Sequence, residues 1–345
     1  MERTKPYRVL VLFVLFVSFT AINLDRGCTM DLEQTCPSIH GKIGVYLTSR
    51  ALTKPEVIDK LLAAIDAGQI NAVVINVKNM HGEITYASSV PVAAEIGAAS
   101  DRSGLVQFIE KLQQKGVYLI ARQVLFYDPM LARYLGSPSV PWVLPSDERA
   151  VSYNLAVARE VIGLGFDEIQ FDYVRFPDGG ELVSQYEDRY AAVNSFLERA
   201  REALSARVAL SIDVFGRVLW DWNKKKIDPI GQSLEEIAEH VDLISPMLYP
   251  SHYHEYRYRN DPYAVVKEAL KTGKARVSTP FRPFLQAFDQ AIPARMTLED
   301  YIRAQILAAV ELHSDGYLFW NPSCEYTALY RVLQEETAKA GTSSG

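Results

Sequence analysis

Charged and polar side chains follow several short apolar segments of this 345-residue sequence, where they would be costly to bury without partners. Asp172 and Asp213 are the two carboxylates of this set. Two carboxyl groups can cleave a glycosidic bond, because one protonates the leaving oxygen while the other attacks the sugar or activates water. The other members of the set could bind a sugar through a cation, an amide or an aromatic ring: Lys78, Arg122, Arg175, Tyr249, Arg282, Gln286 and Trp320.

From residue 43 onward, β-branched or aliphatic segments alternate with helical patterns, which is typical of a parallel α/β fold. The helical patterns include residues 55–68, 103–116 and 153–165, and each ends at a glycine that can close a helix. No glycine-rich phosphate loop follows the first strand, so eight repeats favour a single (β/α)8 TIM barrel over residues 41–335. The predicted strands are 43–49, 72–78, 117–124, 167–174, 208–215, 242–249, 276–281 and 316–321.

In a barrel, chemistry is located at the C-terminal ends of the strands. We therefore expect Asp172 and Asp213, on adjacent strands, to lie within reach of one glycosidic bond. A structural ion network at the barrel mouth, formed by these two carboxylates with Lys78 and Arg122, is the alternative. Because barrel interiors are normally apolar, four charges together favour a site.

Arg122 and Arg175 have two interpretations. Either arginine could keep Asp172 ionised by proximity, or it could bind an acidic sugar. Asp213 is followed by the apolar Val214 and Phe215, so we expect desolvation to raise its pKa toward that of a general acid.

The segment GFDEIQFDYVRFP, residues 165–177, resembles a bacterial family of barrel proteins regarded as glycoside hydrolases and related to α-amylase-like and chitinase-like enzymes. The resemblance extends over residues 43–332 and implies a TIM barrel that hydrolyses glycosidic bonds. Further segments that carry it are NVKNMHGEITY (76–86), IARQVLFYDP (120–129), YNLAVARE (153–160), SIDVFG (211–216), ISPMLYPSHY (244–253) and RPFLQAF (282–288).

The resemblance also implies roles for the two carboxylates. Asp172 takes the strand-four position of the nucleophilic aspartate in α-amylase-like enzymes. Asp213 takes the strand-five position of their acid, which in those enzymes is a glutamate. Chitinases place a catalytic glutamate where this chain has Val174, which excludes their chemistry at that position.

The expected function is hydrolysis of an envelope or extracellular polysaccharide, with no cofactor. The alternatives are a non-catalytic carbohydrate-binding barrel and a barrel enzyme of another class, such as a lyase or deacetylase. The histidine-containing loop 249–263 is interpreted as a wall of the binding groove, with a metal site as the alternative, since its spacing lacks an HExxH-like pattern. The net charge of −6 argues against nucleic acid as a partner, and the oligomeric state stays open.

The N-terminus is basic over residues 1–8 and apolar over residues 9–22, which is typical of a secretory signal. We expect residues 1–40 to be a signal or anchor segment with a linker. The protein would then be secreted, periplasmic or membrane-anchored outside the cytoplasm, and only this segment would contact a membrane. Export would allow Cys28 to pair with Cys36, and residues 336–345 are expected to be a disordered tail.

Overall fold

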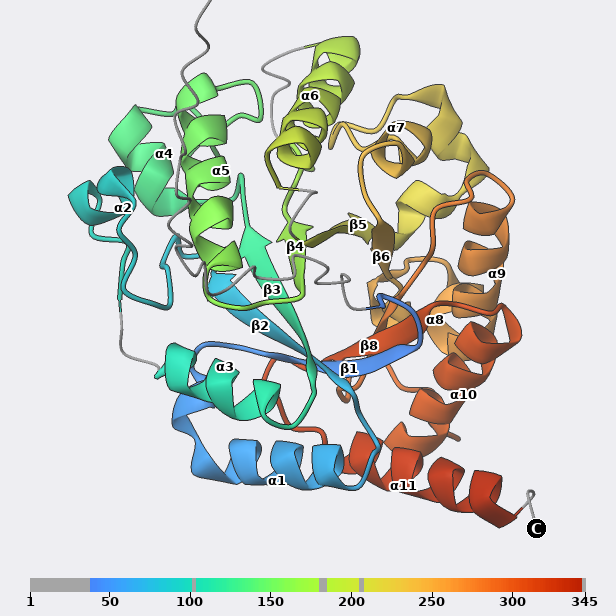
Figure 1. Cartoon of the computed structure of the whole chain (residues 1–345). Coiled ribbons are helices and arrows are strands. Elements are labelled where there is room, and N and C mark those ends of the chain that lie inside the picture. The colour runs from blue at the N-terminus through green and yellow to red at the C-terminus, as the bar shows by residue number, and fades with distance from the viewer. Residues whose placement is uncertain (1–37, 101–103, 180–184, 205–207, 343–345) are drawn as a thin grey trace, which may run out of the picture. The chain divides into compact units, whose positions relative to one another are not determined.

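Eight parallel strands, each paired with the next in chain order, close into a barrel where the last strand pairs with the first (Figure 1). The computed structural model describes residues 38–100, 104–179, 185–204 and 208–342. The predicted (β/α)8 fold is confirmed. The strands are β1 Lys42–Leu47, β2 Ala72–Lys78, β3 Tyr118–Val124, β4 Glu168–Asp172, β5 Ala209–Phe215, β6 Leu243–Met247, β7 Phe284–Gln286 and β8 Gly316–Trp320.

Helices surround the strands, and their ends are set by local sequence (Figure 1). Proline occupies the first turn of several helices, where its missing N–H costs nothing. Thr297 and Asp300 form a capping box at the start of α10. The helices are α1 Pro55–Asp66, α2 Pro91–Glu95, α3 Leu105–Gln113, α4 Pro129–Leu135, α5 Glu148–Ile162, α6 Tyr186–Leu204, α7 Leu234–Ala238, α8 Tyr256–Asn260, α9 Pro262–Lys274, α10 Leu298–Glu311 and α11 Thr327–Thr342.

Successive side chains of a strand point alternately out of the barrel and into it, and they form two separate apolar clusters. Residues pointing outward, such as Val73, Ile75 and Ile169, join the large apolar core between the strands and the helices. Residues pointing inward form a smaller apolar cluster, to which Val74 and Leu318 belong. The rest of the interior is polar, and these polar residues form a floor at the start of the strands and a mouth at their end.

The floor of the barrel is an ion pair that water does not reach. The Arg282 guanidinium contacts Glu168 Oε1, and both side chains are fully buried. Tyr118 donates to Glu168 Oε2 at 3.0 Å, and the Ser211 hydroxyl donates to Glu168 Oε1. These buried polar contacts close the floor of the barrel.

The prediction for the seventh strand was wrong. Residues 276–281 contain β-branched residues, but β7 is the three-residue strand Phe284–Gln286 that follows Pro283. Arg276 instead binds Glu235 through two hydrogen bonds of 2.8 Å. The other seven predicted strands overlap the observed strands.

Several predictions concern the ends of the chain. The signal or anchor segment with its linker was predicted over residues 1–40, and residues 1–37 of it, which include Cys28 and Cys36, lie outside the described residues. Helix α11 continues to Thr342, so part of the segment predicted as a disordered tail is helical. Within the described ranges, no helix is both long and apolar enough to cross a membrane.

Candidate active site

A cavity of about 930 Å³ opens at the C-terminal ends of the strands. This is where barrel chemistry is expected, because side chains from many strands converge there. Six of the nine predicted site residues line it: Arg122, Asp172, Arg175, Asp213, Tyr249 and Trp320.

Asp172, the last residue of β4, is fixed through both of its carboxylate oxygens. Its Oδ2 accepts hydrogen bonds from Arg122 Nη2 and, at 3.0 Å, from Arg122 Nε. Its Oδ1 accepts from the Tyr173 backbone N–H at 2.6 Å. Tyr173 has a φ of 54°, a left-handed conformation that costs about 1–3 kcal/mol for a non-glycine residue and is concentrated at functional sites. The backbone thus bends sharply directly after the carboxylate.

Asp213, on β5, is held differently. It is 2% exposed, and its Oδ1 has no hydrogen-bond partner among the described residues. Burial raises its pKa well above the ordinary value, and the negative charge of Asp172 raises it further, while Arg122 partly opposes both effects. The prediction that desolvation raises this pKa is confirmed.

One guanidinium brings the two carboxylates together. Arg122 Nε lies 3.0 Å from Asp172 Oδ2 and 3.7 Å from Asp213 Oδ2, so these two oxygens are at most 6.7 Å apart. The guanidinium is itself held by Asn76, whose Oδ1 accepts from Arg122 Nη1 at 2.6 Å. Asn76 in turn donates to the Tyr46 hydroxyl at 2.5 Å. Arg122 therefore fixes the geometry of the pair.

Aromatic rings form one wall of the cavity. Tyr249 and Trp320 stack with their centroids 5.3 Å apart, and Phe288 packs edge-on against both rings. Burial and the nearby charge of Asp213 raise the pKa of Tyr249, so its hydroxyl stays protonated as a donor at neutral pH. Such rings can stack on the apolar face of a sugar.

The loop 249–263 contributes His252, Tyr253, His254 and Glu255 to the lining of the cavity. Among the described residues, no group of three or more His, Cys, Asp or Glu side chains could hold a metal ion. The loop thus lies where a wall of the groove is predicted.

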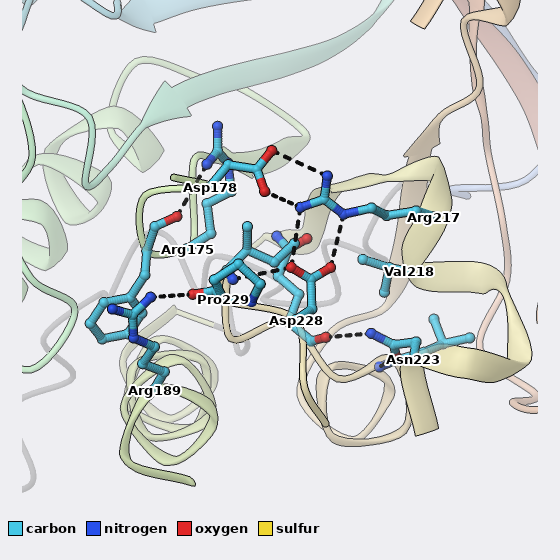
Figure 2. A network of polar contacts seen from close by, with 12 residues as sticks. Arg175, Asp178, Arg189, Arg217, Val218, Asn223, Asp228 and Pro229 are labelled. Carbon is cyan, nitrogen blue, oxygen red and sulfur yellow. Dashed lines mark hydrogen bonds and ion pairs between the residues drawn. The ribbon is translucent and has the colours of Figure 1, made fainter. Parts of the chain in front are cut away.

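Arg217 occupies a second polar network at the cavity (Figure 2). It bridges Asp178, through Nη1 and Nη2, and the buried Asp228, through Nε at 2.8 Å and Nη2 at 3.1 Å. Two carboxylates therefore surround this one cation. Arg175 lies close to this network in Figure 2, but no ion pair joins it to either carboxylate.

Lys78 does not lie at the cavity, contrary to its predicted role. Its ammonium is fully buried, 2.7 Å from Asp128 Oδ2, and donates to the Val124 carbonyl at 2.9 Å. The register of β2 against β3 shifts between Asn76 and Lys78. This irregularity breaks the alternation, so Asn76 points into the barrel and Lys78 does not.

Arg282 and Gln286 are also placed differently from their predicted roles. Because β7 begins only at Phe284, Arg282 precedes the strand and belongs to the floor ion pair. Gln286 ends β7 but is fully buried, and its side chain bonds to the Ser251 N–H and to the Phe288 and Gln290 carbonyls. It holds neighbouring loops in place, with no group left for a ligand.

Sequence reasoning missed several cavity residues. Tyr46 and Asn76 lie on inward-facing positions of β1 and β2, a signal that strict alternation could have provided. Arg217 and Trp220 follow β5 and carry no such signal, since short 3₁₀ turns at 216–219 and 221–225 place them.

Residues 44–326 match the family described as "Putative glycosyl hydrolase domain". The chain belongs to this family. The resemblance found from the sequence motifs is thereby confirmed, while the likeness to α-amylase-like enzymes in particular stays a prediction. Among curated protein sequences, none matches this chain.

Solved glycoside hydrolase structures share the barrel. The glycoside hydrolase domain of PgaB (BpsB) from Bordetella bronchiseptica is 13% identical, with 85% of this chain and 98% of that chain covered and a TM-score of 0.63. The endo-1,4-β-D-mannanase of Thermotoga petrophila is 13% identical, with coverages of 86% and 98% and a TM-score of 0.60. A chitinase from Rhizomucor miehei is 14% identical, with coverages of 85% and 99% and a TM-score of 0.56. At such identities the similarity shows a shared fold.

Proposed function

We propose that this member of the glycosyl hydrolase family cleaves an oligosaccharide or polysaccharide with Asp172 and Asp213 as its catalytic pair. The observation that carries the proposal is the position of Arg122 between the two carboxylates. It pairs closely with Asp172 and only distantly with Asp213, and burial raises the pKa of Asp213, so the two carboxyl groups lie in different electrostatic environments. Two carboxyl groups in one cavity with different environments are the usual basis for separate acid and nucleophile roles.

In the first step, protonated Asp213 donates its proton to the glycosidic oxygen while Asp172 attacks the anomeric carbon. The bond to the leaving sugar breaks, and a glycosyl ester forms on Asp172. In the second step, ionised Asp213 removes a proton from water, which attacks the anomeric carbon and releases Asp172. Arg122 stabilises the carboxylate at the start and end of the cycle.

The separation of the carboxylates favours retention of configuration. Retaining enzymes hold the two groups about 5–5.5 Å apart, whereas inverting enzymes need about 6.5–9.5 Å to accommodate water. The upper limit of 6.7 Å on the distance between the two Oδ2 atoms reaches only the lower edge of the inverting range.

Export to act on an envelope or extracellular polysaccharide is part of the same proposal, on the strength of the basic and apolar residues 1–22. A fusion of residues 1–40 to a reporter that is active only outside the cytoplasm should be active. The same fusion lacking residues 9–22 should be inactive, and equal activity of the two fusions would contradict export.

The test of activity is hydrolysis of a panel of purified polysaccharides by the full chain, followed by NMR of the first-formed reducing ends. We expect new reducing ends with the anomeric configuration of the substrate, and none with Asp172→Asn. A panel glycan that binds without being cleaved by the unaltered chain would instead identify a carbohydrate-binding barrel.

A further inference from the structure

Four arginines line the cavity, and they differ in how their charge is compensated. Arg122 pairs with Asp172, and Arg217 pairs with Asp178 and Asp228. Arg50 is exposed to solvent at the rim. Arg175 is half-buried and forms no ion pair with any carboxylate of the described residues.

Aromatic rings surround the Arg175 guanidinium instead. Its Cζ lies 4.7 Å from the ring centroid of Trp142, 4.9 Å from that of Tyr173 and 4.6 Å from that of Phe215. Its one hydrogen bond among the described residues runs from Nη1 to the Phe176 carbonyl at 3.1 Å. A guanidinium has five N–H donors in a planar fork, so most of its donors are unused.

We propose that Arg175 binds a carboxylate of the substrate, and that the hydrolase therefore acts on an acidic polysaccharide containing uronic acid. The inference rests on the proposed function, because it names the substrate class of the same cavity. Arg175 and Asp172 both line that cavity, so the uronate would bind in the same cavity as the bond that is cleaved.

Desolvation supports this role. Burial lowers the pKa of Arg175, and the carboxylates of Asp172 and Asp178 oppose this effect only in part, so the cation is incompletely compensated. A substrate carboxylate would supply the missing partner. The rings hold the plane of the Arg175 guanidinium, and the paired N–H donors of a guanidinium held in this way can bind the two oxygens of a carboxylate.

The cavity also holds carboxylates that would favour a cationic amino sugar. Glu83 and Glu255 line it, but both are exposed to solvent, and Glu83 accepts a hydrogen bond from Asn79 at 2.8 Å. Solvent screens exposed charges more strongly than the half-buried charge of Arg175. The uronate is therefore the favoured ligand, and an amino sugar is an outcome that the experiment must be able to show.

The experiment measures binding in the Asp172→Asn background, in which hydrolysis cannot remove the ligand. The probes are hexasaccharides of galacturonate, mannuronate and hyaluronan, each paired with its methyl ester, together with a glucosamine hexasaccharide. We expect at least one acid to bind about tenfold or more tightly than its ester, and added salt to weaken this preference.

Variants assign the preference to Arg175. Arg175→Gln should abolish the preference for the acid over the ester, and Arg175→Lys should keep part of it, since it retains the charge without the fork. Arg133→Gln is the matched control, because it removes one exposed arginine of α4 outside the cavity and should leave the preference unchanged. Thermal unfolding of each variant shows whether it folds. If Arg175→Gln does not fold, the test uses Arg175→Lys, whose preference for the acid should be reduced.

Three outcomes would overturn the inference: no acid preferred over its ester, a preference that persists in Arg175→Gln, or tighter binding of the glucosamine probe. Hydrolysis by the unaltered chain separates this inference from the proposed function. Cleavage of neutral glycans at the same rate with and without Arg175 would overturn the inference of an acidic substrate, while the proposed hydrolase function would stand. Arg175-dependent binding of a uronate without any cleavage would overturn the proposed hydrolase function, while the inferred carboxylate-binding role of Arg175 would stand.

Discussion

Arg122 and Asp172 are joined through a single carboxylate oxygen, because Nε and Nη2 of the arginine both donate to Oδ2. Within the part of the chain that the structure describes, the other oxygen, Oδ1, accepts only the N–H of Tyr173. This division makes Oδ1 the less restrained oxygen and therefore the atom that we expect to attack the anomeric carbon.

Replacing Asp172 with Asn should lower turnover by about 10³-fold or more, while the dissociation constant for the glycan changes little. The amide retains the shape of the carboxylate but loses the charge and the nucleophile. Single-turnover kinetics and equilibrium binding measure the two effects separately. Near-normal turnover in this variant would show that Asp172 is not the nucleophile.

Asp213→Asn should slow cleavage of natural glycans strongly, but cleavage of aryl glycosides with good leaving groups much less. Such leaving groups depart with little proton donation, so loss of the acid matters less. The measurement is kcat/KM across aryl glycosides of graded leaving-group pKa. A uniform loss across the series would argue against Asp213 as the acid.

The raised pKa of Asp213 predicts a pH effect on stability. Above the ordinary aspartate pKa, the folded protein keeps a proton that the unfolded chain has lost, so the free energy of unfolding falls as pH rises up to the folded pKa. Denaturant titrations of the unaltered chain and of Asp213→Asn should converge at low pH. They should diverge in favour of the variant at higher pH, and a pH-independent difference would contradict the assignment.

Lys78→Met should destabilise the fold without changing glycan affinity. The change leaves Asp128 as a fully buried carboxylate without its cation, which costs about 3–5 kcal/mol. Lys60→Met is the control, because Lys60 pairs with Glu325 at the surface and its loss should cost less than about 1 kcal/mol. Similar losses in the two variants would contradict the importance of burial.

The sequence predicted the barrel and the position of its two cavity carboxylates better than the rest of the cavity lining. Asp172 is the last residue of β4 and Asp213 lies near the end of the adjacent β5, so the order of the strands and the alternation along them sufficed to bring the two side chains together. The position of Lys78 could not be predicted in this way, because an irregularity after Asn76 reverses which side chains of β2 point into the barrel. Such a shift depends on how β2 pairs with β3. The position of Arg282 could not be predicted either, because the strand that follows it, β7, is only three residues long.

The closed floor has a consequence for how a polymer meets this protein. Since Glu168 and Arg282 seal the lower end of the barrel, the interior is a dead end rather than a passage. A glycan chain must lie across the mouth or insert one terminus, and it cannot be threaded through. For a glycan that inserts one terminus, substrate and product would share a single entrance, so a fragment that is slow to leave would block the next chain and inhibit the enzyme.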